Sequence, residues 1–288
     1  MSNPTPRATR WTASLAIAAV VLAACSTPTD APALSRHMPA EGPAAGFNSP
    51  AVPAFNGWVA DFSDDFSTGP RNQDTWEAYG GGQRPTGGAM GYYERSNVTI
   101  DPARESGTMG LRYLYRDGRW TSSGVSSRPQ FSAVQGRWEF RAKFPRGKGL
   151  GYAFLLWPDN QQWPPEVDMA EGVVNGPTVS SFYHYGTAQD PRREARERQV
   201  PDMTQWHTYG VIMESDRLTY TFDGEPWATV DVAVTTTPLW IGFQTGAIDP
   251  KAVEAQWFEG GVTGGVPNAE TPADATIQID WVAHYRKA

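Results

Sequence analysis

The stretch Pro164-Pro165-Glu166-Val167-Asp168-Met169-Ala170-Glu171-Gly172 places three acids close together in an otherwise apolar segment. Side chains on a regular strand alternate between its two faces, so Glu166 and Asp168 share one face. Glu171 comes five residues after Glu166 and would fall on the other face. One extra residue near Met169 and Ala170, a β-bulge, restores the parity. We therefore predict an irregular strand that gathers three carboxylates on one side.

Three neighbouring carboxylates cannot all ionise cheaply, so at least one pKa should rise. A protonated acid beside an ionised carboxylate is the pair that cleaves glycosidic bonds, one protonating the leaving oxygen and the other attacking the anomeric carbon. Spacing alone leaves two other interpretations open. Calcium is one, although acidic calcium sites usually lie in loops of Asn, Asp and Gly rather than among apolar spacers. A solvated acidic surface is the other.

Segments typical of short strands extend outward from this stretch. Residues 98–100, 109–115, 136–144 and 218–222 alternate or are rich in β-formers. In residues 137–144, Trp and Phe share one face, while Arg, Glu and Lys take the other, as on a strand with one face in a core and the other in water or a polar cleft. Asp117-Gly118 and Asp223-Gly224 are hairpin turn signals. Only residues 192–198 are interpreted as weakly helical. The pattern predicts an all-β two-sheet sandwich as one domain, residues 57–288.

The N-terminal segment has the features of an export signal. Arg7 and Arg10 form a basic region, and an apolar stretch too short to span a bilayer ends in Leu22-Ala23-Ala24-Cys25. Cys25 is the one cysteine of the chain, so it has no disulfide partner within it. The pattern resembles a bacterial lipobox. It predicts a signal peptide over 1–24, lipidation of Cys25 and a Pro/Ala-rich flexible linker over 25–56. The alternative is an ordinary signal peptide with an incidental cysteine.

Composition excludes several other classes of function. The chain is 12% aromatic and 19% charged, with a net charge of -7. Phosphate contacts need clustered Lys and Arg, so nucleic-acid binding is not expected. The four histidines, His37, His184, His207 and His284, show no metal-ligand spacing. No Gly-x-Ser-x-Gly elbow of a serine hydrolase occurs in the sequence.

Glu166-Val-Asp-Met-Ala-Glu171 resembles the E-x-D-x-x-E motif of glycoside hydrolase family 16, in the bulged form typical of its laminarinase-like and agarase-like branches. Further stretches resemble the family in the same order along about 57–288: 61–66 with Trp76, 97–98, 123–125, 136–143, 153–158, 184–186, 206–209, 223–224 and 280–282. The resemblance implies a concanavalin-like β-jelly roll of two curved antiparallel sheets with a sugar cleft on the concave face. It also implies Glu166 as nucleophile, Glu171 as general acid/base and Asp168 as the residue that tunes them.

Other residues are predicted to contact substrate. Trp157 and Trp163 flank the motif, and flat aromatic faces pack well against sugar rings; core packing is the alternative for Trp157. The resemblance to the family implies that four more residues contact the substrate through polar or aromatic side chains: Asn97, Arg141, His184 and Tyr183. The sequence departs from the family at Leu155, where many relatives carry Trp, and in residues 240–246, which differ from a Gly-Gly-rich loop common among laminarinases.

The resemblance implies a retaining endo-β-glycosidase acting on β-1,3 or mixed β-1,3/1,4-glucan, or on a related polysaccharide. No cofactor is expected, and a structural calcium ion is left open. We expect a monomer held at the cell envelope, at the outer membrane or the cell surface, through the lipid on Cys25. Two alternatives stay open: a transglycosylase that remodels an envelope polysaccharide, and a carbohydrate-binding lipoprotein without catalysis.

Overall fold

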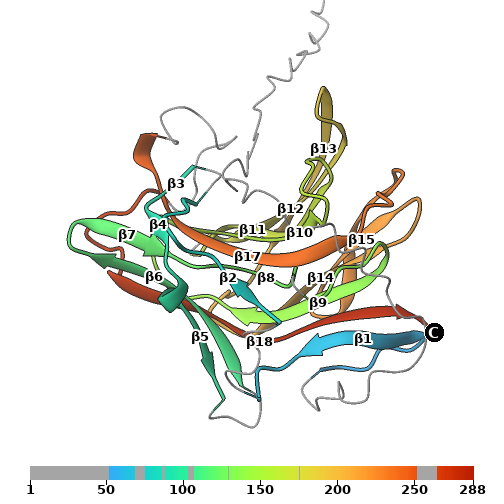
Figure 1. Cartoon of the computed structure of the whole chain (residues 1–288), viewed down its shortest axis with the longest axis horizontal. Helices are drawn as coiled ribbons and strands as arrows, with labels where there is room; N and C mark the ends of the chain where they lie inside the picture. The colour runs from blue at the N-terminus through green and yellow to red at the C-terminus, as the bar shows by residue number, and fades with distance from the viewer. Residues whose placement is uncertain are drawn as a thin grey trace, which may run out of the picture.

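A computed structural model describes residues 52–68, 75–85, 88–102, 107–128, 130–174, 176–251 and 265–288. They form two β-sheets that face each other across a shared core, which confirms the predicted sandwich (Figure 1). Within these ranges, no helix combines the length and apolar character needed to cross a bilayer. The predicted signal peptide, Cys25 and most of the predicted linker lie outside the described residues.

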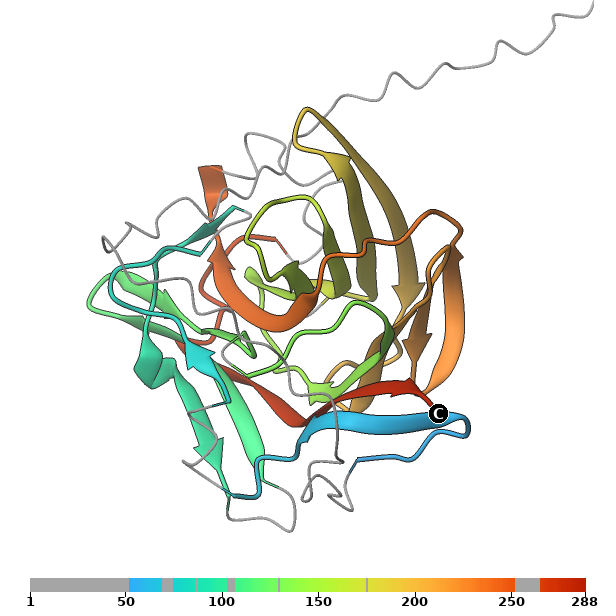
Figure 2. The same ribbon diagram turned by 45° about the vertical axis from the view of Figure 1, so that its right-hand side comes forward.

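The ten-stranded sheet runs in the order β16-β15-β14-β9-β18-β6-β7-β4, with β1 also paired to β18 and β5 to β6. Figure 2 shows β1, in blue, beside β18, in dark red, at the C-terminus. Neighbouring strands are antiparallel apart from the short parallel pair of β4 and β7. A 3₁₀ turn, η2 (Arg95–Asn97), precedes β5. The strands are β1 (Trp58–Asp64), β4 (Tyr92–Tyr93), β5 (Val98–Asp101), β6 (Thr108–Arg116), β7 (Arg119–Ser122), β9 (Gly136–Lys143), β14 (His207–Met213), β15 (Leu218–Phe222), β16 (Glu225–Val230) and β18 (Asp274–Lys287).

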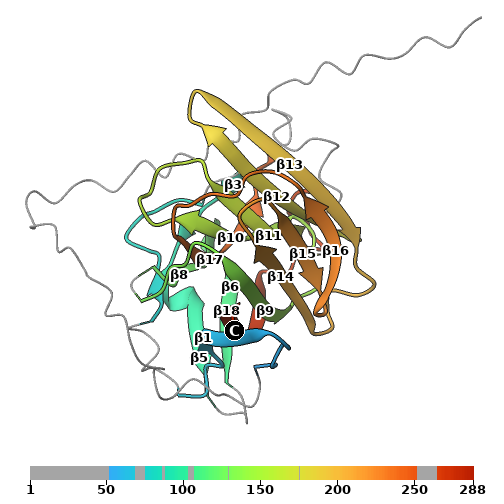
Figure 3. The same ribbon diagram turned by 90° about the vertical axis from the view of Figure 1, so that its right-hand side faces the viewer.

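The eight-stranded sheet runs in the order β13-β12-β11-β10-β17-β8-β2, with β3 paired to β17. Its long strands β12 and β13 form a hairpin that extends past the body of the sandwich (Figure 3). The strands are β2 (Glu77–Ala78), β3 (Ala89–Met90), β8 (Gly124–Ser126), β10 (Leu150–Pro158), β11 (Glu166–Val173), β12 (Thr178–Thr187), β13 (Asp190–Gln199) and β17 (Leu239–Ile248).

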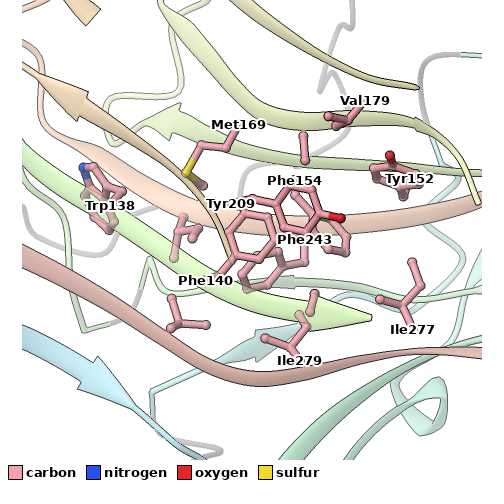
Figure 4. Packing of buried hydrophobic residues seen from close by; sticks show 14 of the residues in the cluster. Trp138, Phe140, Tyr152, Phe154, Met169, Val179, Tyr209, Phe243, Ile277 and Ile279 are labelled. Carbon is pink, nitrogen blue, oxygen red and sulfur yellow. The ribbon is translucent and has the colours of Figure 1, made fainter. Parts of the chain in front are cut away.

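The core lies between the two sheets and is rich in aromatic rings. Phe140 of β9 packs on Phe154 of β10 and Phe243 of β17, with ring centroids 5.3 and 5.4 Å apart (Figure 4). Tyr209 of β14 stacks on Phe140 at 5.4 Å. Side chains from both sheets therefore interdigitate, and each sheet turns its other face away from its partner.

Both predicted hairpin turns are confirmed. Asp117 and Gly118 join β6 to β7 with positive φ angles of 52° and 75°, and Asp223 and Gly224 join β15 to β16 with 50° and 82°. Positive φ at both central residues matches the right-handed twist of the strands on either side, and Gly accepts it without steric cost.

One secondary-structure prediction is wrong. The weak helix expected at residues 192–198 is part of strand β13, which pairs with β12 over its whole length. The side chains of Arg196 and Arg198 reach back to the other sheet, at the Thr229 carbonyl and the Phe222 ring. Pairing with a long neighbour strand and these cross-sheet contacts override the helix propensity of the charged residues.

The polar face expected on β9 is partly buried. Arg137 and Glu139 form a buried ion pair, with N–O 2.7 Å, and Thr221 also donates to Glu139. Phe55 covers the Arg137 guanidinium at 3.5 Å and packs edge-on against Tyr285. Residues 52–56, assigned to the linker from sequence, therefore pack against the domain where they are described.

Candidate active site

Strand β11 contains the predicted bulge. Asp168 lies opposite Phe182, and Glu171 lies opposite Ser180, so three steps along β11 match two steps along β12. The register with β10 shifts at the same place. The extra residue restores the parity that simple alternation would break, and the three acids share one face of the sheet. The prediction of an irregular strand is confirmed.

Packing on the inner side holds the bulge in place. Met169 and Ala170 are adjacent in sequence, yet both are buried in the core between the sheets, as Figure 4 shows for Met169. The Ser181 hydroxyl donates to the Met169 carbonyl at 2.8 Å and satisfies a buried group that the irregular ladder would otherwise leave weakly bonded.

The acids lie on what we call the acid face, the face of the eight-stranded sheet that carries Glu166, Asp168 and Glu171 and turns away from the ten-stranded sheet. Val167, between the first two acids, points the other way into the core. Glu166 is 7% exposed and Asp168 is 2% exposed, whereas Glu171 is half-buried. The acids are thus largely desolvated, and Glu171 is the most open to solvent.

Two aromatic side chains contact the first two acids. The indole N–H of Trp163 donates to Glu166 Oε2 at 2.7 Å. His184 on β12 lies opposite Glu166, with its Nε2 3.4 Å from Asp168 Oδ2. The Trp163 and His184 rings are 5.7 Å apart. The structure therefore brings Trp163 and His184, both predicted substrate contacts, to the acids.

Burial raises the pKa of every acid in the group. The pKa of Asp168 rises to about 8, and that of Glu171 also rises to about 8, the latter helped by the neighbouring charge of Asp168. Burial and Asp168 raise the pKa of Glu166 well above its ordinary range, while His184 and the Trp163 hydrogen bond oppose the rise. Desolvation lowers the pKa of His184. The site therefore holds protons at neutral pH, as predicted from the sequence.

Glu166, Asp168 and His184 bring one ligand atom each within 4.8 Å of one another, close enough to consider a cation. Calcium needs six to eight oxygen ligands, which two carboxylates and an imidazole do not supply. Glu166 Oε2 also accepts the Trp163 N–H, so a cation there would compete with a hydrogen-bond donor. The donor set of these three residues therefore does not fit calcium.

Trp157 is on the acid face but covered. Leu155, opposite Asp168 in the register, forms a small cluster with Trp157 and Trp240, against which Trp163 packs. Trp157 is 2% exposed. Trp157 therefore packs against its neighbours and does not present its ring to a sugar. This agrees with core packing, the alternative interpretation for Trp157. Leu155, where the sequence departs from the family, does lie on the acid face.

The structure does not bring Asn97 or Arg141 to the acids. Asn97 is 2% exposed, and its amide donates to Thr121 and to the Ser122 carbonyl. Arg141 lies on β9 of the other sheet, where it pairs with Asp280. Both predicted substrate contacts are contradicted, because one side chain is saturated by internal bonds and the other belongs to the opposite sheet.

Tyr183 is also misplaced by the prediction. It alternates with His184 on β12 and so points into the core, where it is 1% exposed. Its hydroxyl accepts the backbone N–H of Thr235 at 3.0 Å. Family position correctly indicated this stretch of strand, but the parity of the strand sends neighbouring side chains to opposite faces.

Sequence reasoning missed two residues beside the acids. Phe182 lies opposite Asp168, and Arg193 on β13 lies opposite His184, with its guanidinium 5.3 Å from the centre of the Phe182 ring. The charge of Arg193 lowers the pKa of Asp168 and of Glu171, against the effect of burial. The helical interpretation of residues 192–198 hid the alternation that would have placed Arg193 on this face.

Comparison with known proteins identifies the family to which the chain is similar. The family model "Glycosyl hydrolases family 16" matches residues 89–283. The endo-1,3-1,4-beta-glycanase EglC of Rhizobium meliloti is 28% identical over 167 residues, which cover 58% of this chain and 33% of that protein. The chain thus spans about a third of the length of that relative. A beta-glucanase of Rhodothermus marinus is 26% identical over 259 residues, 80% of this chain and 85% of the relative.

Solved structures share the fold. A glycoside hydrolase family 16 endo-glucanase from Bacteroides ovatus superposes with a TM-score of 0.64 at 21% identity, covering 77% of this chain and 99% of that one. At this level of identity the likeness concerns the arrangement of the two sheets and not the substrate.

Proposed function

The chain belongs to glycosyl hydrolases family 16, and from this premise we propose that it is a retaining endo-β-glucanase acting on β-1,3 or mixed β-1,3/1,4-glucan. One observation carries the proposal: the bulge in β11 sets Glu166 and Glu171 on the same face with Asp168 between them. An acid face with two aromatic side chains, Trp163 and Phe182, suits a neutral sugar chain, because flat rings pack against the apolar faces of sugars.

The spacing of the two glutamates suits a double displacement. Glu166 lies opposite His184 and Glu171 opposite Ser180, so their backbones are four strand steps apart, about 13 Å. Two glutamate side chains leaning toward each other can bridge that gap to the roughly 5–5.5 Å between carboxyls that retaining enzymes need. Asp168 is shorter and lies between them.

In the proposed reaction, a Glu166 oxygen attacks the anomeric carbon and the glycosidic C–O bond breaks. The leaving oxygen takes its proton from Glu171, and the sugar remains bound to Glu166 as an ester. Glu171, now ionised, takes a proton from water, whose oxygen attacks the same carbon and releases Glu166. Two inversions leave the product in the β configuration.

The electrostatics of the site fit the acid role of Glu171, whereas burial opposes the ionised form that Glu166 needs, so other groups must favour that form. Glu171 must start protonated, and its pKa of about 8 keeps it so at neutral pH. A protonated Asp168, with its pKa also near 8, no longer repels a charge on Glu166. The Trp163 N–H then stabilises the ionised form of Glu166, the form that attacks. Asp168 thus tunes the pair rather than touching the bond that breaks.

The names of the relatives support the choice of substrate. The Rhizobium meliloti and Rhodothermus marinus proteins are an endo-1,3-1,4-beta-glycanase and a beta-glucanase. The proposed substrate of this chain belongs to the same class. Laminarin and lichenan carry the two kinds of linkage, and the hydrolytic activity of the protein should be measured on both.

The experiment compares the unaltered protein with Glu166→Gln and Glu171→Gln, each isosteric, and with Glu225→Gln as a matched control on the exposed β16 of the other sheet. We expect the unaltered protein to release reducing ends, and each active-site variant to lose a factor of about 10³ or more in turnover. Proton NMR of the first product should show the β anomer. Full activity in Glu166→Gln, or a first product in the α configuration, would overturn the proposal.

We also propose that the protein is exported and held at the cell envelope by a lipid on Cys25. The basic residues, the short apolar stretch and Leu22-Ala23-Ala24-Cys25 support this. Cells expressing the chain and fed radiolabelled palmitate should yield a labelled protein in the membrane fraction, and Cys25→Ser should remove the label. Equal labelling of both forms, or recovery of the unaltered protein without lipid, would contradict it.

A further inference from the structure

A row of three side chains crosses the acid face at Glu171. Glu171 of β11 lies opposite Ala153 of β10, and Ala153 lies opposite Gln244 of β17. Residues directly opposite one another project from the same face of a sheet. Gln244 is therefore two strand spacings from Glu171, about 9–10 Å between backbones. Only the methyl group of Ala153 stands between them in the row, and both Ala153 and Gln244 are half-buried.

The amide of Gln244 is held in one orientation. The hydroxyl of Tyr93, which is 4% exposed, donates to Gln244 Oε1 at 2.8 Å. A side-chain amide carries its acceptor oxygen and its NH₂ group on opposite sides of one carbon. With the oxygen turned to Tyr93, the two N–H donors turn to the other side of the amide.

Tyr93 is itself fixed by a second tyrosine. Its ring packs edge-on against Tyr79, with centroids 5.5 Å apart. Tyr79 lies directly on Gly124 of β8, where a Cβ atom would come within 2.2 Å of the Tyr79 ring. Gly124 is the residue opposite Gln244 on that side. The close approach allowed by Gly124 thus positions Tyr79, which in turn positions Tyr93 and the amide.

In the rows on either side of Ala153, which pair Leu155 with Gly242 and Gly151 with Gly246, side chains cover the glycines of β17. Toward one end, Trp240 covers Gly242 and packs with Leu155. Toward the other end, Ala89 lies on Gly246, at 2.4 Å from the position of a Cβ. Ala153 carries only a methyl group, which packs against the cluster of Leu155, Trp157 and Trp240 and is half-buried, so Glu171 and Gln244 flank a short side chain.

We propose that Gln244 is a specificity-determining residue of the glucanase, which donates its amide N–H to a hydroxyl of a sugar ring lying over Ala153 beside Glu171. The inference rests on the proposed function and adds the position and chemistry of one subsite contact. A pyranose ring carries hydroxyls at its edge, and an oriented donor at one side of the ring distinguishes linkages by where those hydroxyls fall. Tyr93 is a positioning residue for this contact.

Binding is measured by calorimetry in a Glu166→Gln background, which separates affinity from cleavage. The ligands are β-1,3 and mixed β-1,3/1,4 gluco-oligosaccharides from disaccharide to hexasaccharide. Gln244→Met, of similar size but without the amide, should weaken binding about three- to tenfold for oligosaccharides above a minimum length. Tyr93→Phe should give a smaller loss over the same lengths, because the amide stays but is no longer held. Gln278→Met, on half-buried Gln278 of the other sheet, is the control.

The same variants in the active protein give a second readout. Gln244→Met should raise KM for long oligosaccharides and shift which bond is cut, while melting at the temperature of the unaltered protein. Unchanged affinity and product pattern would overturn the inference. An equal loss at every chain length together with a lower melting temperature would also overturn it, by showing a structural role. If the Glu166→Gln protein binds no oligosaccharide at all, the proposed function fails, and this inference fails with it.

Discussion

Trp163, three residues before β11 begins, donates its indole N–H to Glu166, the first acid of that strand, at 2.7 Å. The bond favours the ionised form of Glu166, against the burial and the neighbouring Asp168 that raise its pKa. In the proposed mechanism, this ionised form is the nucleophile. Trp163 is therefore more than a flat surface for a sugar.

Replacing Trp163 by Phe keeps a ring and removes the donor. The pKa of Glu166 should rise further, so the acid limb of the pH–rate profile should move to higher pH. A hydrogen bond to a charged group contributes about 1.5 kcal/mol or more, so kcat/KM should fall about tenfold. Trp206→Phe is the control, because Trp206 directly precedes β14 of the other sheet and its ring lies beside Arg141. An unmoved acid limb in Trp163→Phe would show that the bond does not tune Glu166.

The alkaline limb depends on Glu171, which must be protonated to act as the acid. Activity should fall as pH rises through about 8, the pKa of Glu171. The positive charge of Arg193 lowers that pKa, so Arg193→Gln should move the alkaline limb to higher pH, and Arg193→Lys should leave it nearly in place. Profiles at low and high salt provide the check, because salt screens an exposed charge. A shift toward lower pH would contradict the assignment.

Asp168→Asn should stabilise the protein at high pH while reducing activity. The pKa of Asp168 lies near 3.8 in the unfolded chain and at about 8 when folded. Well below pH 3.8 the group is protonated in both states. Between these values the unfolded chain loses the proton and the folded chain keeps it, so wild-type stability falls as pH rises. The melting temperature of the variant should be a few °C above that of wild type at pH 8, and the two melting temperatures should be nearly equal at pH 4. An equal difference in melting temperature at both pH values would contradict this account.

The bulge can be tested by deleting single residues. Without Met169, the strand becomes regular and Glu166, Asp168 and the final Glu occupy alternate positions, so all three acids still share one face. Without Val167, Glu166 moves to a position that faces the core. We expect the Met169 deletion to be less stable, since it removes a buried side chain, and yet to keep measurable activity per folded molecule. The Val167 deletion should be inactive. The reverse result, with circular dichroism showing both folded, would contradict the parity argument.

Local patterns were enough to predict the sandwich, both Gly-containing turns and the bulge. Each depends on alternation or on a φ angle, which neighbouring residues determine. The edge strand β13 was missed because its charged residues at 192–198 have helix propensity, and only pairing with β12 makes them extended. Long-range pairing of this kind has no local signal.

The site residues divide in the same way. Trp163 and His184 lie beside the acids, but Tyr183 is one residue out of phase and Arg141 is on the other sheet. Gln244 lies in one row with Glu171 because β17 pairs with β10, and β10 pairs with β11. Which side chains are adjacent in such a row depends on the register between strands that are far apart in sequence. The identity of a single residue does not predict that register.

The claim that Glu166 is the nucleophile of a retaining reaction is tested most directly by trapping the covalent intermediate. The unaltered protein is incubated with a 2-deoxy-2-fluoro gluco-oligosaccharide carrying a dinitrophenyl leaving group, and its peptides are then sequenced by mass spectrometry. We expect one added glycosyl group, attached to Glu166, in the peptide that also contains Trp163. A glycosyl group attached to Glu171 or to any other residue would contradict it.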